Sequence, residues 1–454
     1  MTFSARDLAL AVHGSWCGTP PDQISGIFTD TRADGRGKLF VALAGERFDA
    51  HDFLDSAVAS GAAAVCVQRG RAFPENVPAL VVEDTLAAFQ AMGAFRRMML
   101  PDLKCCAVTG SVGKTSVKEM LRAIFSYAAG EDQVLATSGN TNNHIGVPQN
   151  LLKLQKQHRF AVLEAGMSHP GEILPLAMMI KPGCAIVNSI APCHIEHLGS
   201  LAGIAEEKGN LFKGLSPEGT AVIPRDSDQC KILEAAAAGH RILYFGTSDS
   251  CDVRAEYCGG SIDGGRFKLH FKNAGSFEIS WSLPGRHQAL NAAAAAAAAL
   301  SFGIAPQDIC AALPRTVLPG MRSKITRING AVFINDAYNA NPASMASALD
   351  YLEEAVPEPE NLILLLGGML ELGSESAQRH DDLLAAALKR FPLARMISFG
   401  KPFAEAAKKY QVEFFEDPAD ARETVAQLAV SGKIIFAKGS RGIGVERALP
   451  EEAK

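Results

Sequence analysis

The 454-residue sequence predicts an α/β protein of three domains. Its length is about three times the ~150 residues that one domain usually takes, and strand-like and helix-like patterns alternate along it. We expect a small N-terminal α/β domain over 1–83 and a longer, doubly wound central domain over 84–313. The segment 314–320 holds three turn-forming residues in seven, which predicts a linker that opens a third domain over 314–454.

The first two domains begin with recognisable elements. Ser4, with Asp7 three residues later, is expected to cap a short helix. Strands are then predicted over 39–43 and 62–67. In the central domain the pattern predicts a helix over 85–99, a strand over 104–108, a glycine-rich turn, a helix over 116–127, and strands over 160–164 and 185–190. The alanine run 292–299 predicts a buried helix rather than a disordered tract.

The third domain resumes the alternation of strands and helices. Its expected strands cover 331–335, 362–366, 396–399 and 433–437, with helices between them. Alternation of this kind is typical of a parallel sheet, so a Rossmann-like architecture is expected for the C-terminal domain.

Composition excludes several classes of protein. Hydrophobic residues make up 48% and charged residues 20%, which is typical of a globular chain. The net charge of −5 argues against a protein that binds nucleic acid mainly through positive charge. The ten cysteines form no CxxC pair, which favours a reducing compartment. With no apolar run of ~18 residues and no signal-peptide core, we expect no membrane association and a cytoplasmic location.

The strongest local motif follows the first central strand. It reads Thr109-Gly110-Ser111-Val112-Gly113-Lys114-Thr115 and stands before a predicted helix. Its glycines let successive N–H groups face phosphate, Lys114 would neutralise the β and γ oxygens, and Thr115 would ligate magnesium. Val108 stands where the usual motif has its first glycine. The motif predicts an ATP site and a P-loop ATPase-like central domain.

Other polar residues near strand ends are less specific on their own. Glu164 ends a predicted strand, at the edge where open α/β sheets bind ligands, and is a candidate magnesium ligand. A single Glu in a turn is more often solvated or capping, by roughly three to one. His194 follows another strand, where a lone histidine is more often structural, and composition alone makes Lys208 a surface lysine.

Taken together, these segments resemble the Mur ligase family, ATP-dependent enzymes that form amide bonds in peptidoglycan synthesis. The stretch Asp336-Ala337-Tyr338-Asn339-Ala340-Asn341-Pro342-Ala343-Ser344-Met345 is similar to the members that add D-alanyl-D-alanine to UDP-N-acetylmuramoyl-tripeptide. Further matching stretches are 45–53, 164–166, 194–196, 208–209, 285–287 and 438–442.

The resemblance implies a role for each matching residue. It implies ATP, two magnesium ions and a monomeric enzyme, with Lys114, Lys208 and His194 as catalytic residues. Nucleotide contacts would come from residues 109–115 (Thr109, Gly110, Ser111, Val112, Gly113, Lys114, Thr115), from Asn291 at adenine, Arg322 at the γ-phosphate and Asp336 at ribose. Metal ligands would be Thr115, Glu164, His194 and Lys208, the last carbamylated. Substrate contacts would come from Thr31, Arg32, Arg47 and His51 for the UDP-sugar, and from Asn339, Asn341, Lys438 and Arg441 for the dipeptide.

Three positions depart from the family pattern. Gln288 replaces an Asn near the adenine, which keeps the amide but lengthens its reach. Ala50 replaces a common Gly. Gly368 replaces a common Asp and removes a carboxylate from the third-domain pocket.

The activity that the resemblance implies is ligation through an acyl phosphate, with the dipeptide amine as the nucleophile. Two alternatives stay open: another ATP-dependent amide ligase, of the diamino-acid-adding or folate polyglutamate type, or a P-loop regulatory ATPase. The stretch 336–345 and the extra N-terminal domain favour the dipeptide-adding type over the other ligases. The third residue of the acceptor peptide, meso-diaminopimelate or lysine, is not encoded in any motif.

Overall fold

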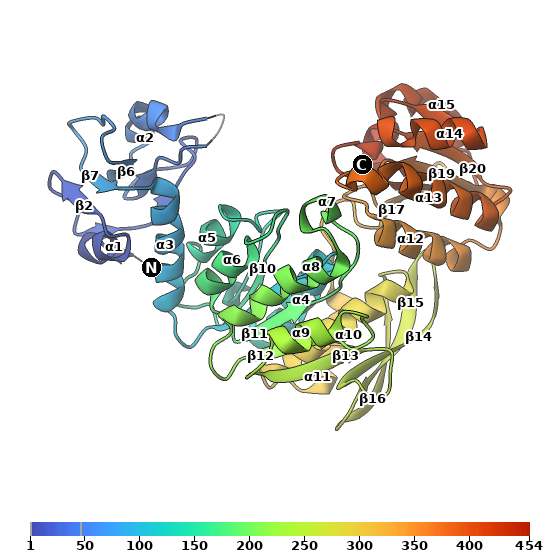
Figure 1. The fold of residues 1–454 in the computed structure, drawn as a ribbon, viewed down its shortest axis with the longest axis horizontal. Helices are drawn as coiled ribbons and strands as arrows, with labels where there is room; N and C mark the ends of the chain where they lie inside the picture. The colour runs from blue at the N-terminus through green and yellow to red at the C-terminus, as the bar shows by residue number, and fades with distance from the viewer. Residues whose placement is uncertain (1, 46–47) are drawn as a thin grey trace.

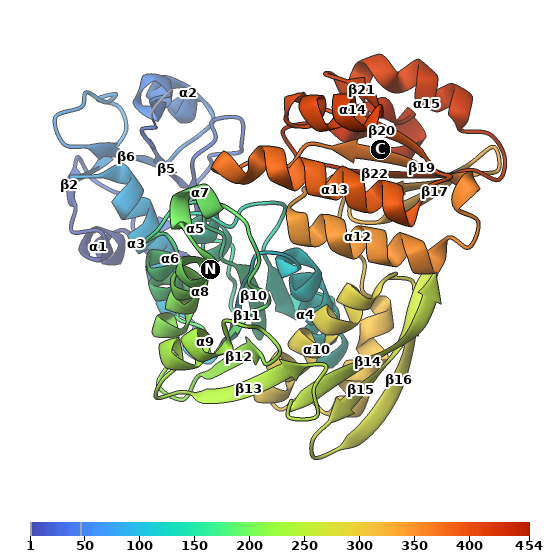
Figure 2. The ribbon, with the colours of Figure 1, turned by 45° about the vertical axis from the view of Figure 1, so that its right-hand side comes forward.

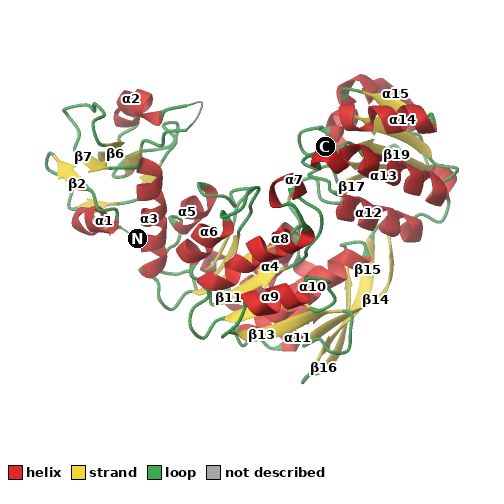
Figure 3. Cartoon of the chain, in the orientation of Figure 1, coloured by secondary structure: helices red, strands yellow, loops and turns green. Residues whose placement is uncertain are grey.

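The computed structural model describes residues 2–45 and 48–454, and every structural statement below concerns this part of the chain. Three α/β units follow one another along it (Figure 1). The N-terminal and C-terminal units stand on either side of the central unit, and each pairs strands with covering helices (Figure 3). The three-domain α/β fold predicted from the sequence is confirmed.

The N-terminal unit has a five-stranded sheet among its described residues. Its order is β2 (Ser15–Cys17), β7 (Ala79–Val82), β6 (Ala64–Gln68), β5 (Leu39–Val41) and β4 (Ile27–Phe28), with only β2 antiparallel to its neighbour. Helices α1 (Ala5–Ala11) and α2 (Leu54–Ala59) and the short strands β1 (Phe3–Ser4) and β3 (Gln23–Ile24) complete it. Ser4 accepts a hydrogen bond from the Asp7 amide, so the predicted N-cap is confirmed.

Helix α3 (Thr85–Met98) joins the first two units. Phe89 and Met92 lie in the core beneath the N-terminal sheet, while the helix also packs against α5 (Gly146–Leu151) and α6 (Ile173–Ile180) of the central unit. At Gly93 the helices approach so closely that a Cβ atom would lie 2.8 Å from the Pro148 Cα atom. Helix α3 therefore packs against both the N-terminal and the central unit. The domain boundary placed after residue 83 stays a prediction.

The central sheet has nine strands in the described chain, in the order β16-β15-β14-β13-β12-β11-β8-β10-β9. The strands are β8 (Lys104–Thr109), β9 (Val134–Ala136), β10 (Phe160–Glu164), β11 (Cys184–Val187), β12 (Thr220–Pro224), β13 (Arg241–Gly246), β14 (Val253–Ser261), β15 (Gly264–Phe271) and β16 (Gly275–Trp281). All pairs are parallel except those of β15 with β14 and β16. Strand β8 lies between β10 and β11, so the loop after it opens between two neighbouring parallel strands rather than at an edge of the sheet.

Helices cover both faces of this sheet. One face packs on α4 (Lys114–Ala129), α10 (Arg286–Ser301) and α11 (Pro306–Ala312). The other packs on α5, α6, α8 (Leu201–Gly209) and α9 (Cys230–Ala236), with the short α7 (Ile195–Leu198) nearby. Residues 292–299 in α10 are all fully buried, which confirms the helix expected from the alanine run. Their small side chains let α10 lie close to α4.

The C-terminal unit has a six-stranded sheet in the described chain, in the order β17-β18-β22-β19-β20-β21. Its strands are β17 (Lys324–Ile328), β18 (Ala331–Asn335), β19 (Leu362–Gly367), β20 (Arg395–Phe399), β21 (Glu413–Phe415) and β22 (Ile434–Lys438), and its helices are α12 (Pro342–Ala355), α13 (Ser376–Arg390), α14 (Ala404–Tyr410) and α15 (Arg422–Leu428). All strand pairs except β17–β18 are parallel, as expected for a Rossmann-like unit.

Helix α12 rests on the central unit near the β14–β15 hairpin (Figure 2). The Glu354 carboxylate accepts a hydrogen bond from the Gly260 amide at 2.7 Å, and Arg327 pairs with Asp263. These contacts set the C-terminal unit above the carboxyl ends of the central strands. Within the described residues, no helix combines the length and apolarity needed to cross a membrane.

Candidate active site between the central and C-terminal domains

A cavity of about 580 Å³ lies between the central and C-terminal units. Its central wall includes the loop after β8, Glu164, His194 and Asn291. Its C-terminal wall includes Arg322, Asp336, Tyr338, Asn339, Asn341 and Lys438. The structure therefore brings most of the predicted nucleotide and dipeptide residues to one cavity that two domains enclose.

Strand β8 extends to Thr109, so the phosphate loop begins at Gly110, one residue later than the predicted strand 104–108 implies. Val108 stays within β8 and pairs with Glu164 of β10 and Ile186 of β11, so the position of the missing glycine is sheet, not loop. Lys114 is the first residue of α4, two residues before the start of the predicted helix, and its Nζ donates to the Gly110 carbonyl at 2.5 Å. The helix N-terminus and Lys114 thus share the space where phosphate would bind.

Gly113 needs its lack of a side chain for two reasons. Its φ of 81° lies in the left-handed region, and a Cβ atom would lie 2.3 Å from Asn188 Nδ2 and 2.4 Å from Asn291 Oδ1. The Asn188 amide donates to Asn291 at 2.8 Å and to the Val112 carbonyl at 3.0 Å. Asn291, predicted to contact adenine, therefore supports the loop from beneath and also bonds to Gln288 at 3.1 Å.

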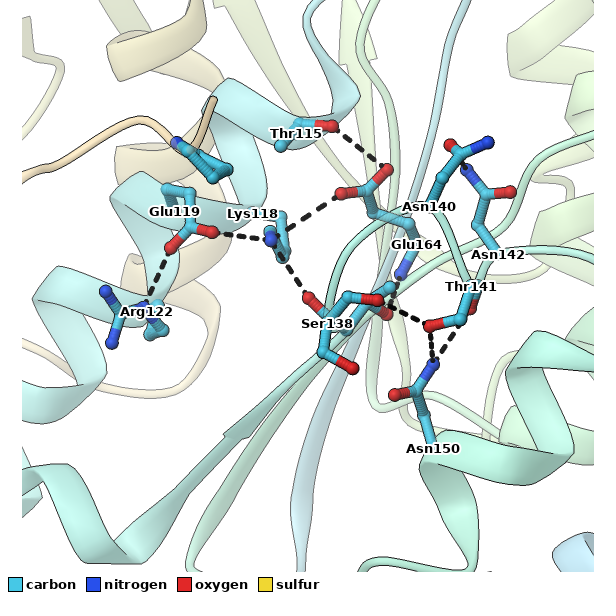
Figure 4. A network of polar contacts seen from close by, with 12 residues as sticks. Thr115, Lys118, Glu119, Arg122, Ser138, Asn140, Thr141, Asn142, Asn150 and Glu164 are labelled. Atoms are coloured by element: carbon cyan, nitrogen blue, oxygen red, sulfur yellow. Dashed lines mark hydrogen bonds and ion pairs between the residues drawn. The ribbon is translucent and has the colours of Figure 1, made fainter. Parts of the chain in front are cut away.

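Figure 4 shows the polar network beyond the loop, where three elements meet. Thr115 donates to Glu164 Oε2 at 3.2 Å. The buried Lys118 ammonium donates to Glu119 at 2.6 Å and to the Thr137 carbonyl at 2.9 Å, and it lies 3.8 Å from Glu164 Oε1. At the outer end of the network, Arg122 donates to the Glu119 carboxylate at 2.7 Å. Lys118 therefore offsets two buried carboxylates and ties α4 to the strand ends.

The donor atoms around Glu164 suit magnesium. Glu164 Oε1 is buried and has no hydrogen-bond partner among the described residues, and the Thr115 hydroxyl lies beside the other carboxylate oxygen. Carboxylate and hydroxyl oxygens are ligands that Mg²⁺ accepts, with water and phosphate filling the remaining positions. Among the described residues, no three His, Cys, Asp or Glu side chains form a metal cage, so these residues offer an incomplete set.

His194 faces the C-terminal unit as well as the cavity. Its Nδ1 lies 2.5 Å from Glu371 Oε2, which joins two domains. Burial lowers the pKa of His194, helped by the charges of Lys114 and Lys208, while Glu371 acts in the opposite direction. The structure places His194 at the cavity wall.

Lys208 lies at the end of α8 and is buried, contrary to the surface position that composition favours. Burial, with a smaller contribution from the charge of Lys114, lowers the pKa of Lys208 to about 7. Burial therefore favours the neutral amine, which is the form that reacts with carbon dioxide.

Two of the predicted dipeptide residues already have partners within the C-terminal unit. The Lys438 ammonium donates to Asp336 at 2.5 Å and to the Asn339 carbonyl at 3.2 Å, so neither Lys438 nor the Asp336 Oδ2 atom is free. Asn341 caps α12 by accepting from the Ser344 amide at 2.9 Å. These contacts assign Lys438 and Asn341 at least a structural role.

Arg441 does not line the cavity in the structure. It pairs with Glu446 at 2.7 Å, and its side chain is exposed. The prediction that it meets the dipeptide carboxylate therefore has no support from this geometry.

Three of the four residues predicted for the UDP-sugar lie in the described part of the N-terminal unit. Arg32 pairs with Asp30 at 2.6 Å on the surface, beside a half-buried Thr31. His51 is buried and uses both ring nitrogens, with Asp49 at 2.6 Å and the Gln68 amide at 3.0 Å, so the structure assigns it a structural role. Arg47 lies outside the described residues.

The three positions that depart from the family pattern lie in close-packed surroundings. A Cβ atom on Gly368 would lie 3.0 Å from the Pro402 side chain, a tight contact that a larger residue relieves only if Pro402 shifts. Gln288 is buried against Asn291, and Ala50 is buried at the start of a short 3-10 helix (Ala50–Phe53).

Two residues of this region, Lys118 and Tyr338, were given no role from the sequence. Lys118 stands one helical turn after Lys114, which is the signal that would have identified it.

The comparisons with known proteins agree with this architecture. Residues 108–299 match the Mur ligase middle domain, and residues 321–441 match the Mur ligase, glutamate ligase domain. The UDP-N-acetylmuramoyl-tripeptide–D-alanyl-D-alanine ligase of Escherichia coli is 37% identical over 436 residues, covering 94% of each chain. The ligase of the same name from Haemophilus influenzae is 34% identical and covers 98% of this chain and 97% of its own length.

A solved structure gives the same result. The crystal structure of MurF from Acinetobacter baumannii superposes with a TM-score of 0.91 at 33% identity, covering 100% of this chain and 99% of the other. Fold and cavity define a three-domain enzyme with a phosphate-binding loop at a domain interface. The chain belongs to the Mur ligase family.

Proposed function

We propose that this ligase joins D-alanyl-D-alanine to UDP-N-acetylmuramoyl-tripeptide at the expense of ATP, a step of peptidoglycan precursor synthesis. The observation that carries the proposal is the shared cavity, which has the phosphate loop on one wall and residues 336–348 on the other. Relatives that match nearly the whole chain bear the name of this activity. A P-loop regulatory ATPase would not need a second wall of polar residues from the C-terminal domain opposite the phosphate loop.

The chemistry requires activation of a carboxylate, because oxide is a poor leaving group. The C-terminal carboxylate oxygen of the tripeptide attacks the γ-phosphorus of ATP, the bond to the β–γ bridging oxygen breaks, and ADP leaves. The amine of D-alanyl-D-alanine then attacks the acyl carbon, phosphate leaves with the C–O electron pair, and the amine loses a proton. Enclosure between two domains protects the acyl phosphate from water.

The chain's residues divide this work between them. Lys114 and the amides at the start of α4 hold the transferring phosphoryl group, and Arg322 approaches from the other domain. Thr115 and Glu164 would hold magnesium, which neutralises phosphate charge when bound. His194 and a carbamylated Lys208 would complete the metal environment. The N-terminal domain is proposed to bind the UDP-sugar end.

The acceptor test distinguishes this function from its relatives. The protein is given ATP, magnesium and UDP-N-acetylmuramoyl-tripeptide with D-alanyl-D-alanine, D-alanine, L-lysine or meso-diaminopimelate, and phosphate release and product mass are recorded. We expect turnover with the dipeptide alone, because a single amino acid leaves pocket groups unpaired. Equal turnover of a free amino acid on a shorter UDP-peptide would place the chain elsewhere in the family, and ATP hydrolysis independent of any peptide would favour a regulatory ATPase.

Carbamylation of Lys208 is a separate prediction. Its support is the buried amine, whose pKa is lowered to about 7 by burial and by the charge of Lys114. We expect Lys208→Ala to lose most activity and to recover part of it with added short carboxylic acids, which would occupy the vacated space. Lys213→Ala, at a neighbouring exposed lysine, serves as the control. An unrescued Lys208→Ala with full activity would show an ordinary lysine.

A further inference from the structure

Arg322 connects the C-terminal unit directly to the phosphate loop. Its Nη2 donates to the Thr115 hydroxyl at 3.2 Å, although the two residues are 207 positions apart. Its Nη1 donates to the Pro319 carbonyl at 3.0 Å. The guanidinium carbon lies 3.5 Å from the centre of the Tyr338 ring, so the cation stacks on an aromatic face.

The backbone around Tyr338 braces the segment that carries Arg322. The Tyr338 amide donates to the Met321 carbonyl at 3.1 Å, and the Ser323 amide donates to Asp336 Oδ1 at 3.0 Å. Lys438 in turn holds Asp336 at 2.5 Å. The residues before and after Arg322 are therefore held in place: Met321 by Tyr338 itself, and Ser323 by Asp336, two positions before Tyr338.

We propose that Tyr338 is a positioning residue, whose ring holds the Arg322 guanidinium toward the phosphate loop so that Arg322 meets the terminal phosphate of ATP. The inference rests on the proposed function, because it assumes that ATP occupies the cavity. Arginine has a long side chain with many rotamers, and a stacked ring removes most of them before the ligand arrives. The arrangement also makes phosphate contact depend on the position of the C-terminal domain.

The ring face, rather than the hydroxyl, makes this contact. Phenylalanine should therefore replace Tyr338 without loss, whereas leucine removes the π-face while keeping an apolar side chain. The matched pair Tyr338→Phe and Tyr338→Leu separates stacking from bulk. Tyr338→Met is a second variant without an aromatic face, should the leucine variant not fold.

The direct measurement is ligand binding by calorimetry in the presence of magnesium, with ADP and with a non-hydrolysable ATP analogue that keeps the γ-phosphate. For Tyr338→Leu we expect analogue binding to weaken roughly tenfold, with ADP binding within twofold of wild type. Under ligation conditions kcat should fall while the KM for D-alanyl-D-alanine is unchanged. Tyr338→Phe should match wild type in each measurement.

Three results would overturn the inference. Equal weakening of ADP and analogue binding would assign the ring to adenine or to general structure. A Tyr338→Phe variant as impaired as Tyr338→Leu would assign the effect to the hydroxyl. Additive losses in a double variant with Arg322→Gln would show that the two residues act separately. Failure of the proposed function would appear differently, as wild-type protein that makes no product with the dipeptide.

Discussion

Replacing Lys114 with alanine is expected to slow ligation by on the order of 100-fold or more while leaving the fold intact. Lys114 is the first residue of α4, and its only described hydrogen bond is to the Gly110 carbonyl. Its loss removes a positive charge from the place where the phosphoryl group transfers, and no buried side chain loses a partner. The measurement is the dipeptide-dependent rate of phosphate release, with the thermal midpoint recorded in parallel.

A suitable control is Lys231→Ala, because Lys231 is an exposed lysine in the first turn of α9, away from the cavity. The control should keep wild-type activity and stability. If Lys114→Ala stays within threefold of wild type, the loop after β8 does not bind ATP. A variant that loses activity together with its thermal transition would leave Lys114 with a structural role instead.

The sequence predicted the buried strands most accurately. The strands expected over 160–164 and 331–335 have those bounds in the structure, as β10 and β18. Parallel strands that are covered on both faces read as continuous apolar runs, which leave little doubt about their ends. The hairpin β14–β15 was not predicted, although the alternation of buried and more exposed residues along β15 is the pattern of a half-buried strand.

The part of the site that is contiguous in sequence was predicted, whereas contacts between distant residues were not. Loop residues 109–115 are contiguous, so their motif reports their chemistry directly. The pairing of Lys438 with Asp336 spans 102 positions, and no local pattern encodes such a contact. The assignment of His51 to the UDP-sugar stays a prediction, and in the structure its ring nitrogens bond to Asp49 and to the Gln68 amide, contacts that no local pattern encodes.

Replacing Lys118 with methionine is expected to destabilise the central domain by roughly 3–5 kcal/mol. Methionine keeps the length of the side chain but removes the cation from between Glu119 and Glu164, which are both buried. The Thr137 carbonyl also loses its donor. Thermal unfolding should show the midpoint of the central domain lowered by on the order of 10 °C.

The control is Lys153→Met, because Lys153 donates to the neighbouring Ser138 hydroxyl at 3.1 Å from an exposed position. Its loss should change stability by no more than about 0.5 kcal/mol. If uncompensated charge is the cause, adding Glu119→Gln to Lys118→Met should restore part of the lost stability, since one buried carboxylate is then neutral. Equal midpoints for Lys118→Met and Lys153→Met would show that water or a shifted Arg122 replaces the ammonium, and that Glu164 does not depend on Lys118.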